Sequence, residues 1–170
     1  MINNELFADV HFIVEGQRIH AHKSILVARS VHFAAMFSSG MRESFEKNVV
    51  IPVIRIPIFM ALLEYLYTDT LEDSIEPVMA IEVYTAADVY QMDRLKNLCI
   101  SIVEKDMVVE NAALLLNTCH ELHAEELFTL ILTFITTNMG AVARSESYHT
   151  LSRSLLISIS DAFHIKEEMK

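Results

Sequence analysis

The sequence predicts an α/β (α+β) fold in which a small, mainly three-stranded sheet flanked by helices precedes an all-helical C-terminal extension. Three observations lead to this prediction. β-Branched and aromatic residues alternate in short segments within the first 50 residues, and helical periodicity dominates the rest. The 170 residues include only three Gly and three Pro. Hydrophobic residues make up 52% of the chain, which is typical of a largely helical globular protein and not of a disordered one.

The first 50 residues mix strands with helices. A hairpin is expected because an alternating segment precedes a glycine-containing turn and a second alternating segment. Ser30 is expected to cap a helix, since its hydroxyl can accept a bond from the first helical N–H groups. The predicted elements are a strand over Asp9–Val14, a turn over Glu15–Gln17, a strand over Arg18–Ala21, helices over His22–Arg29 and after Ser30, and a strand over Asn48–Ile54 that Pro52 ends.

Only helices are predicted for the remainder. Pro57 occupies a position that a first helical turn tolerates, and that helix is expected to end near Asp69. Further helices are predicted over Glu76–Tyr90, Met92–Asp106, Val109–His120, Ala124–Asn138 and Leu151–Phe163. No flexible linker interrupts them, so we expect one α/β domain over residues 1–104 and a helical region over residues 105–170, fused directly.

The charge balance excludes some partners. The net charge is −10 and the isoelectric point about 5.2, whereas nucleic-acid binding and attraction to an anionic membrane both need clustered basic residues. No apolar run approaches the roughly 18 residues that span a bilayer. Cys99 and Cys119 lie in apolar helical patterns and are expected to be reduced and buried. With no basic N-terminal signal region, we expect an intracellular protein of the cytoplasm, the nucleus or both.

No pattern of residues predicts a catalytic, cofactor-binding or metal site. His20 and His22 form one pair of potential metal ligands and Cys119 and His123 another, but neither has a third ligand nearby. The sequence contains no Gly-x-Ser-x-Gly elbow and no glycine-rich phosphate loop. We therefore predict an interaction module and not an enzyme.

Asp9 and Lys23 are a candidate pair of another kind. The hairpin is expected to bring the residue that opens the first strand near the residue that follows the second. A partly buried ion pair would be costly to break, because the remaining charge would lose its partner. Spacing alone does not separate a structural pair from a ligand-binding pocket.

Several stretches together resemble a known family. "FADVHFIVEGQRIHAHKSILVARSVHFAAMFSSGMRES" resembles the start of a BTB (POZ) domain, with Asp-Val, a Gly turn, Ala-His-Lys, Ala-Arg-Ser and Met-Phe in the family's order. "FMALLEYLYTDTLE" and "AADVYQMDRLKNLCISIVEKDM" resemble later helices of that domain. "VVENAALLLNTCHELHAEELFTLILTFITTN" is similar to the start of a BACK domain, so residues 105–170 resemble a 3-box and partial BACK region. "YLYTDTLE" also resembles BTB segments attached to RCC1-like or kelch-type repeats.

The resemblance implies a protein-protein interaction module of the BTB/POZ fold, without catalytic residues or cofactors. Many members bind cullin-3 as substrate adaptors of ubiquitin ligases through a hydrophobic-x-Glu motif, which Met41, Arg42 and Glu43 match in type and position. Asp9 and Lys23 match the family's charged-pocket pair, which we interpret as structural. The implied partners are cullin-3, a second copy of the chain, and a substrate protein bound by a domain outside this sequence.

The alternative is a homodimerisation or scaffold module that serves transcription or the cytoskeleton without a cullin. Family dimers use a helix ahead of the Asp-Val strand, and only "MINNELFA" precedes Asp9. We therefore expect either a fragment of a longer protein or a different dimer.

Overall fold

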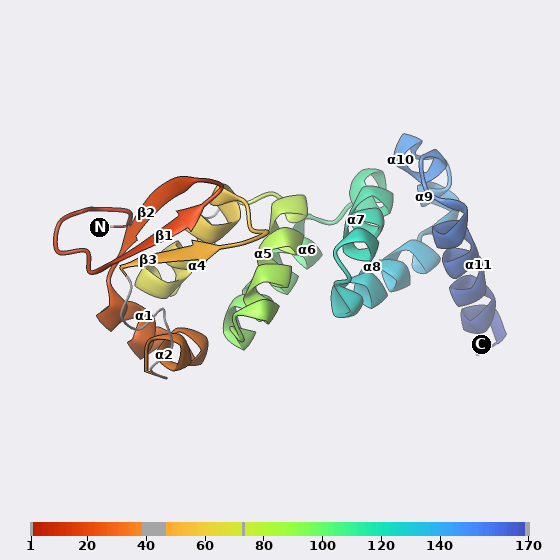
Figure 1. Ribbon diagram of the computed structural model, residues 1–170. Coiled ribbons are helices and arrows are strands. Elements are labelled where there is room, and N and C mark those ends of the chain that lie inside the picture. The colour runs from red at the N-terminus through yellow and green to blue at the C-terminus, as the bar shows by residue number, and fades with distance from the viewer. Residues whose placement is uncertain (1, 39–46, 73, 169–170) are drawn as a thin grey trace. The chain divides into compact units, whose positions relative to one another are not determined.

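The computed structural model describes residues 2–38, 47–72 and 74–168 (Figure 1). Its contacts divide the chain into two compact units, Met1–Ile75 with Ala86–Leu98, and Glu76–Thr85 with Cys99–Lys170. Helices α5 (Pro77–Val89) and α6 (Asp93–Asp106) contribute residues to both units. The predicted domain boundary between residues 104 and 105 stays a prediction, because units delimited by contacts do not test it.

The first unit contains a three-stranded sheet of order β2-β1-β3. Strands β1 (Val10–Val14) and β2 (Gln17–Ala21) form the expected antiparallel hairpin, and β3 (Asn48–Ile51) pairs with β1 in parallel. Glu15 and Gly16 join the hairpin with φ values of 48° and 78°. A two-residue hairpin turn whose twist matches that of its strands requires a positive φ at both residues.

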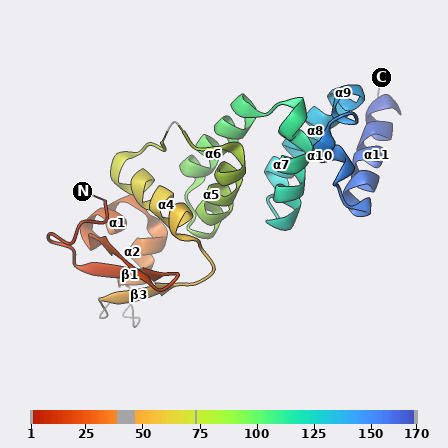
Figure 2. The same cartoon turned by 90° about the horizontal axis from the view of Figure 1, so that it is seen from above.

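Helices cover one face of this sheet. They are α1 (Lys23–Arg29), α2 (Val31–Ser38) and α4 (Ile56–Thr68), and Figure 2 shows them on the same side of β1 and β3. The side chain of Phe12 in β1 lies in the core, with its ring centroid 5.6 Å from that of Phe33 in α2 and 5.0 Å from that of Phe59 in α4. All three phenylalanines are fully buried, so the aromatic cluster joins the sheet to two helices.

Helix α4 is the central helix of the first unit. Seven of its 13 residues are buried, so it is surrounded by protein over most of its circumference. Pro57 lies in its first turn as predicted, and the helix is capped at its C-terminus by Asp69 in the left-handed conformation (φ 63°). Asp tolerates this conformation better than most residues because its short side chain can bond locally.

The second unit is helical where it is described. Besides its parts of α5 and α6, it contains α7 (Val109–Glu121), α8 (Glu125–Thr137), α9 (Met139–Val142), α10 (Glu146–His149) and α11 (Arg153–Glu168). Asn111 explains where α7 begins: its Oδ1 accepts the N–H of Val108 (2.8 Å) and its Nδ2 donates to the carbonyl of Asp106 (3.0 Å). These bonds satisfy backbone groups that a helix start leaves without partners.

The predicted fold class is confirmed, and some details differ. Strand β3 ends at Ile51 and not at Ile54, because Pro52 has no N–H to donate and Val53 has a φ of 67° that leaves the strand conformation. Two short helices, α9 and α10, lie between the helices predicted over Ala124–Asn138 and Leu151–Phe163, where no helix was predicted. Cys99 and Cys119 are free and buried as predicted, and burial raises the pKa of each thiol to about 12.

Candidate interaction surface

The structure brings Asp9 and Lys23 together at the junction between the hairpin and α1. Val10 pairs with Ala21, so the residue before β1 lies next to the first residue of the helix. Oδ1 of Asp9 accepts the backbone N–H of Lys23 at 2.7 Å. Asp9 therefore caps the N-terminus of a helix to which it does not belong, where a carboxylate is favoured by the exposed N–H groups and the helix dipole.

The side chain of Lys23 extends toward α2. Its ammonium nitrogen lies 5.0 Å from the ring centroid of Phe37, within the range of a cation–π interaction. Lys23 is half-buried and Asp9 is exposed. The hydrogen bond between the two residues thus uses the backbone N–H of Lys23, whereas the sequence suggested an ion pair with its side chain. A role of the two residues in binding a partner stays a prediction.

His22 and Tyr67 join the same junction to α4. The Tyr67 oxygen accepts the N–H of His22 at 3.0 Å and lies 2.8 Å from its Nδ1 atom, while Nε2 of His22 lies 3.1 Å from the carbonyl oxygen of Leu6. A carbonyl only accepts, so Nε2 carries the proton and Nδ1 accepts the hydroxyl proton of Tyr67. Burial raises the pKa of the Tyr67 hydroxyl, which keeps this donor protonated. Both ring nitrogens of His22 are therefore used in holding the fold.

A groove of about 430 Å³ lies beside this junction, between α1 and the end of α4. It is lined by Ser24, Ile25, Ala28 and Arg29 of α1 and by residues 66–69. The apolar part of its lining comes from Ile25, Ala28 and Leu66, and its charged end is formed by Arg29 and Asp69. The groove thus combines an apolar floor with a polar end, as protein surfaces that contact partners commonly do.

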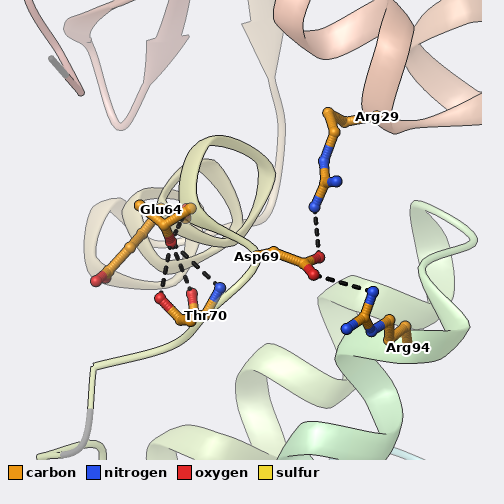
Figure 3. Close-up of polar contacts among 6 residues, drawn as sticks. Arg29, Glu64, Asp69, Thr70 and Arg94 are labelled. Carbon is orange, nitrogen blue, oxygen red and sulfur yellow. Dashed lines mark hydrogen bonds and ion pairs between the residues drawn. The ribbon is translucent and has the colours of Figure 1, made fainter.

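Three charged side chains meet at that end of the groove. Figure 3 shows the carboxylate of Asp69 between Arg29 of α1 and Arg94 of α6. Arg94 Nη1 lies 2.9 Å from Oδ2 of Asp69, and Arg29 bonds to Oδ1. The side chains of Arg29 and Arg94 are 40% and 74% exposed, so each ion pair contributes at most about 1 kcal/mol to stability. Two guanidinium groups facing one carboxylate leave this corner positive in a chain of net charge −10.

Backbone and hydroxyl groups close the last turn of α4 next to Asp69. The hydroxyl of Thr68 donates to the carbonyl of Glu64 (2.7 Å), and the N–H of Thr70 donates to the hydroxyl of Thr68 (3.2 Å), in the region that Figure 3 also draws. The second bond gives a partner to the N–H of Thr70, which lies past the end of the helix. The two bonds hold the left-handed residue Asp69 in the position from which it meets both arginines.

The predicted docking residues Met41, Arg42 and Glu43 lie outside the described residues. They belong to the segment between α2, which ends at Ser38, and β3, which begins at Asn48. Sequence reasoning had not singled out Tyr67, Arg29, Asp69 or Arg94. Tyr67 and Asp69 do belong to "YLYTDT", which resembles a family segment. Arg29 is 40 positions from Asp69, and His22 is 45 positions from Tyr67.

Comparison with known proteins identifies the family. Residues 1–107 match the BTB/POZ domain. The chain belongs to the BTB/POZ family. This domain is a protein-interaction module, which agrees with the predicted class of function. In the part of the chain that the structure describes, no helix is long and apolar enough to cross a membrane.

Relatives from animals and from a plant are similar to this chain. BTB/POZ domain-containing protein 9 of Drosophila melanogaster is 32% identical over 90% of this chain and 21% of its own length. TD and POZ domain-containing protein 2 of Mus musculus is 32% identical over 95% of this chain and 44% of its own. BTB/POZ and MATH domain-containing protein 6 of Arabidopsis thaliana is 31% identical over 85% of this chain and 38% of its own length. The chain thus spans less than half of each relative.

Among solved structures, the BTB domain of human gigaxonin is similar to this chain. It has a TM-score of 0.49 and 23% sequence identity, over 57% of this chain and 78% of that one.

Proposed function

We propose that this BTB/POZ chain is the cullin-binding part of a substrate adaptor for a cullin-3 RING ubiquitin ligase. The observation that carries the proposal is a hydrophobic-x-Glu triplet, Met41-Arg42-Glu43, between α2 and β3 of a BTB/POZ domain. Met supplies a flexible apolar knob for a helical groove on a partner, and a Glu carboxylate can accept a charge-assisted bond or face the N-terminus of a partner helix. The helices that follow residue 107 support the proposal, because they resemble the 3-box and BACK segments that extend the cullin surface in adaptors.

The lengths of the relatives fit the same proposal. A substrate adaptor needs a second region that selects the substrate, and this chain corresponds to 38% of a relative whose name includes a MATH domain. We infer that substrate selection belongs to a part of the protein outside the 170 residues. Asp9 and Lys23 then serve to fix α1 against the hairpin.

Calorimetric titration with the N-terminal domain of cullin-3 tests the proposal. Met41→Asp combined with Glu43→Lys removes both the apolar knob and the charge, and hot-spot losses of at least about 2 kcal/mol weaken affinity by roughly 30-fold or more. Ile165→Asp with Glu167→Lys is the matched control, because it makes the same changes in another hydrophobic-x-Glu triplet near the C-terminal end. Circular dichroism establishes that both variants stay folded.

The proposal fails if the wild-type chain does not bind, or if the two double variants bind with equal affinity. A loss confined to the Met41 and Glu43 variant supports it.

A specific observation favours self-association as a second candidate function. Leu6 and Phe7, ahead of β1, expose 64% and 85% of their surface. Adjacent large apolar side chains that contact water favour burial against another surface, and a second copy of the chain would provide one. Light scattering tests this: a dimer that becomes monomeric when both residues are changed to Ser supports a homodimer, and a wild-type monomer at high concentration contradicts it.

A further inference from the structure

Two histidines face each other across the hairpin on the sheet face opposite the aromatic cluster. His11 of β1 and His20 of β2 are directly paired residues. The N–H of His11 donates to the carbonyl of Lys47 (2.6 Å) and that of His20 to Oδ1 of Asn3 (2.9 Å), so neither N–H bonds across the pair. A non-hydrogen-bonded antiparallel pair holds its side chains closest together.

The two rings approach through equivalent atoms. Nδ1 of His11 lies 3.0 Å from Nδ1 of His20. The ring centroids are 4.8 Å apart and the ring planes meet at 83°, which directs an edge of one ring at the other. Both side chains are half-buried, so solvent still reaches the pair.

This separation matches the spacing of two ligands on one metal ion. Metal–imidazole bonds of about 2.0–2.1 Å place two nitrogens about 2.9 Å apart at a 90° ligand angle and about 3.4 Å apart at a tetrahedral angle. The observed 3.0 Å lies within this range and near its lower end. Small rotations of the two rings would turn both Nδ1 lone pairs toward a shared ion without a change in the backbone.

We propose that His11 and His20 bind one late first-row divalent metal ion, such as Ni²⁺, Cu²⁺ or Zn²⁺, through their Nδ1 atoms. Imidazole suits these ions, whereas Mg²⁺ and Ca²⁺ prefer oxygen ligands. The Nδ1 proton that now joins the two rings moves to the Nε2 atom of its own ring through solvent, so both ligands bind as neutral imidazoles. Water molecules occupy the other coordination positions.

The surroundings limit the strength of this site. No group of three or more His, Cys, Asp or Glu side chains suited to a metal occurs among the residues that the structure describes. Glu5 attracts positive charge near His11, while Arg18 and Lys47 oppose it. The site therefore resembles an open two-ligand chelate and differs from a structural zinc centre, which uses four protein ligands. His22 is not a further ligand of this site, because both its ring nitrogens have other hydrogen-bond partners.

Titration calorimetry of the intact chain with NiCl₂ and ZnCl₂ at neutral pH tests the proposal. One ion is expected per chain, with no binding of MgCl₂. His11→Gln and His20→Gln are each expected to weaken the affinity about tenfold or more, since loss of one ligand breaks the chelate. His164→Gln, which changes an exposed histidine of α11, is the matched control and keeps the wild-type affinity.

A second measurement needs no variant. Substoichiometric Cu²⁺ is expected to give an electron paramagnetic resonance spectrum with coupling to two imidazole nitrogens, and to broaden the NMR signals of the His11 and His20 rings before those of other histidines. The proposal is overturned if the wild-type chain binds neither Ni²⁺ nor Zn²⁺, if folded His11→Gln and His20→Gln variants bind as tightly as the wild type, or if Cu²⁺ first broadens other histidines.

Discussion

Changing Tyr67 to Phe removes a single oxygen atom and is expected to lower the free energy of unfolding by about 2 kcal/mol. That oxygen accepts the backbone N–H of His22 at 3.0 Å and donates to its Nδ1 atom at 2.8 Å. Each bond contributes about 0.5–1.5 kcal/mol net, and a donor left without a partner in a half-buried site adds to the loss. The phenyl ring itself keeps its packing, so the change reports on these two bonds.

Urea denaturation followed by circular dichroism measures this effect. With a slope of about 2 kcal/mol per molar urea, a loss of about 2 kcal/mol lowers the midpoint by about 1 M. Tyr148→Phe is the matched control: within the described part of the chain its hydroxyl has no hydrogen bond, and a change within about 0.5 kcal/mol is expected. Equal midpoints for Tyr67→Phe and the wild type would refute the argument that the Tyr67 hydroxyl holds the hairpin–helix junction together.

Two other predictions concern the core of the first unit. Phe33 is fully buried, with its ring centroid 5.6 Å from that of Phe12 and 5.3 Å from that of Tyr90. Phe33→Ala is expected to lower the free energy of unfolding by about 3–5 kcal/mol, as measured by thermal or urea unfolding. Phe33→Leu is expected to lower it by less than half as much. Burial lowers the pKa of His32 below its ordinary 6.5, so the unfolded chain binds the proton more readily and stability falls as the pH drops from 6.5 through the folded-state pKa. An NMR titration should place the midpoint of His32 below 6.5, and a midpoint at or above that value would contradict this assignment.

The hairpin and most helices were predictable because local patterns determine them. Asp9–Val14 alternates with period two, Glu15-Gly16 suits a tight turn, and Pro57 marks the first turn of a helix. The prediction for strand β3 was too long because Val53 is β-branched and apolar, and such residues favour strands. In the structure, Val53 instead adopts a positive φ where the chain leaves the sheet. Helices α9 and α10 are four residues each, too short for periodicity to reveal them.

The candidate site was less predictable than the fold. Asp9 and Lys23 could be placed near each other from the hairpin alone, but the bond between them uses the Lys23 backbone, and backbone partners have no signature in residue type. Tyr67 and His22 are 45 positions apart, and no periodicity connects them. The sequence suggested His22 as the neighbour of His20 for a metal, whereas the register of the hairpin places His11 beside His20.

The sequence by itself determined the class of this protein, a BTB/POZ interaction module. The role of the triplet Met41-Arg42-Glu43 in binding a cullin stays a prediction. The sequence could determine the class because element type, turns and family motifs are local features of the chain. Only the tertiary structure decided that Asp69 lies between Arg29 and Arg94, that Tyr67 holds His22, and that His11 meets His20. Such contacts depend on strand register and on helix packing around the Phe12, Phe33 and Phe59 core, and these are set by the sum of many weak interactions over the whole domain.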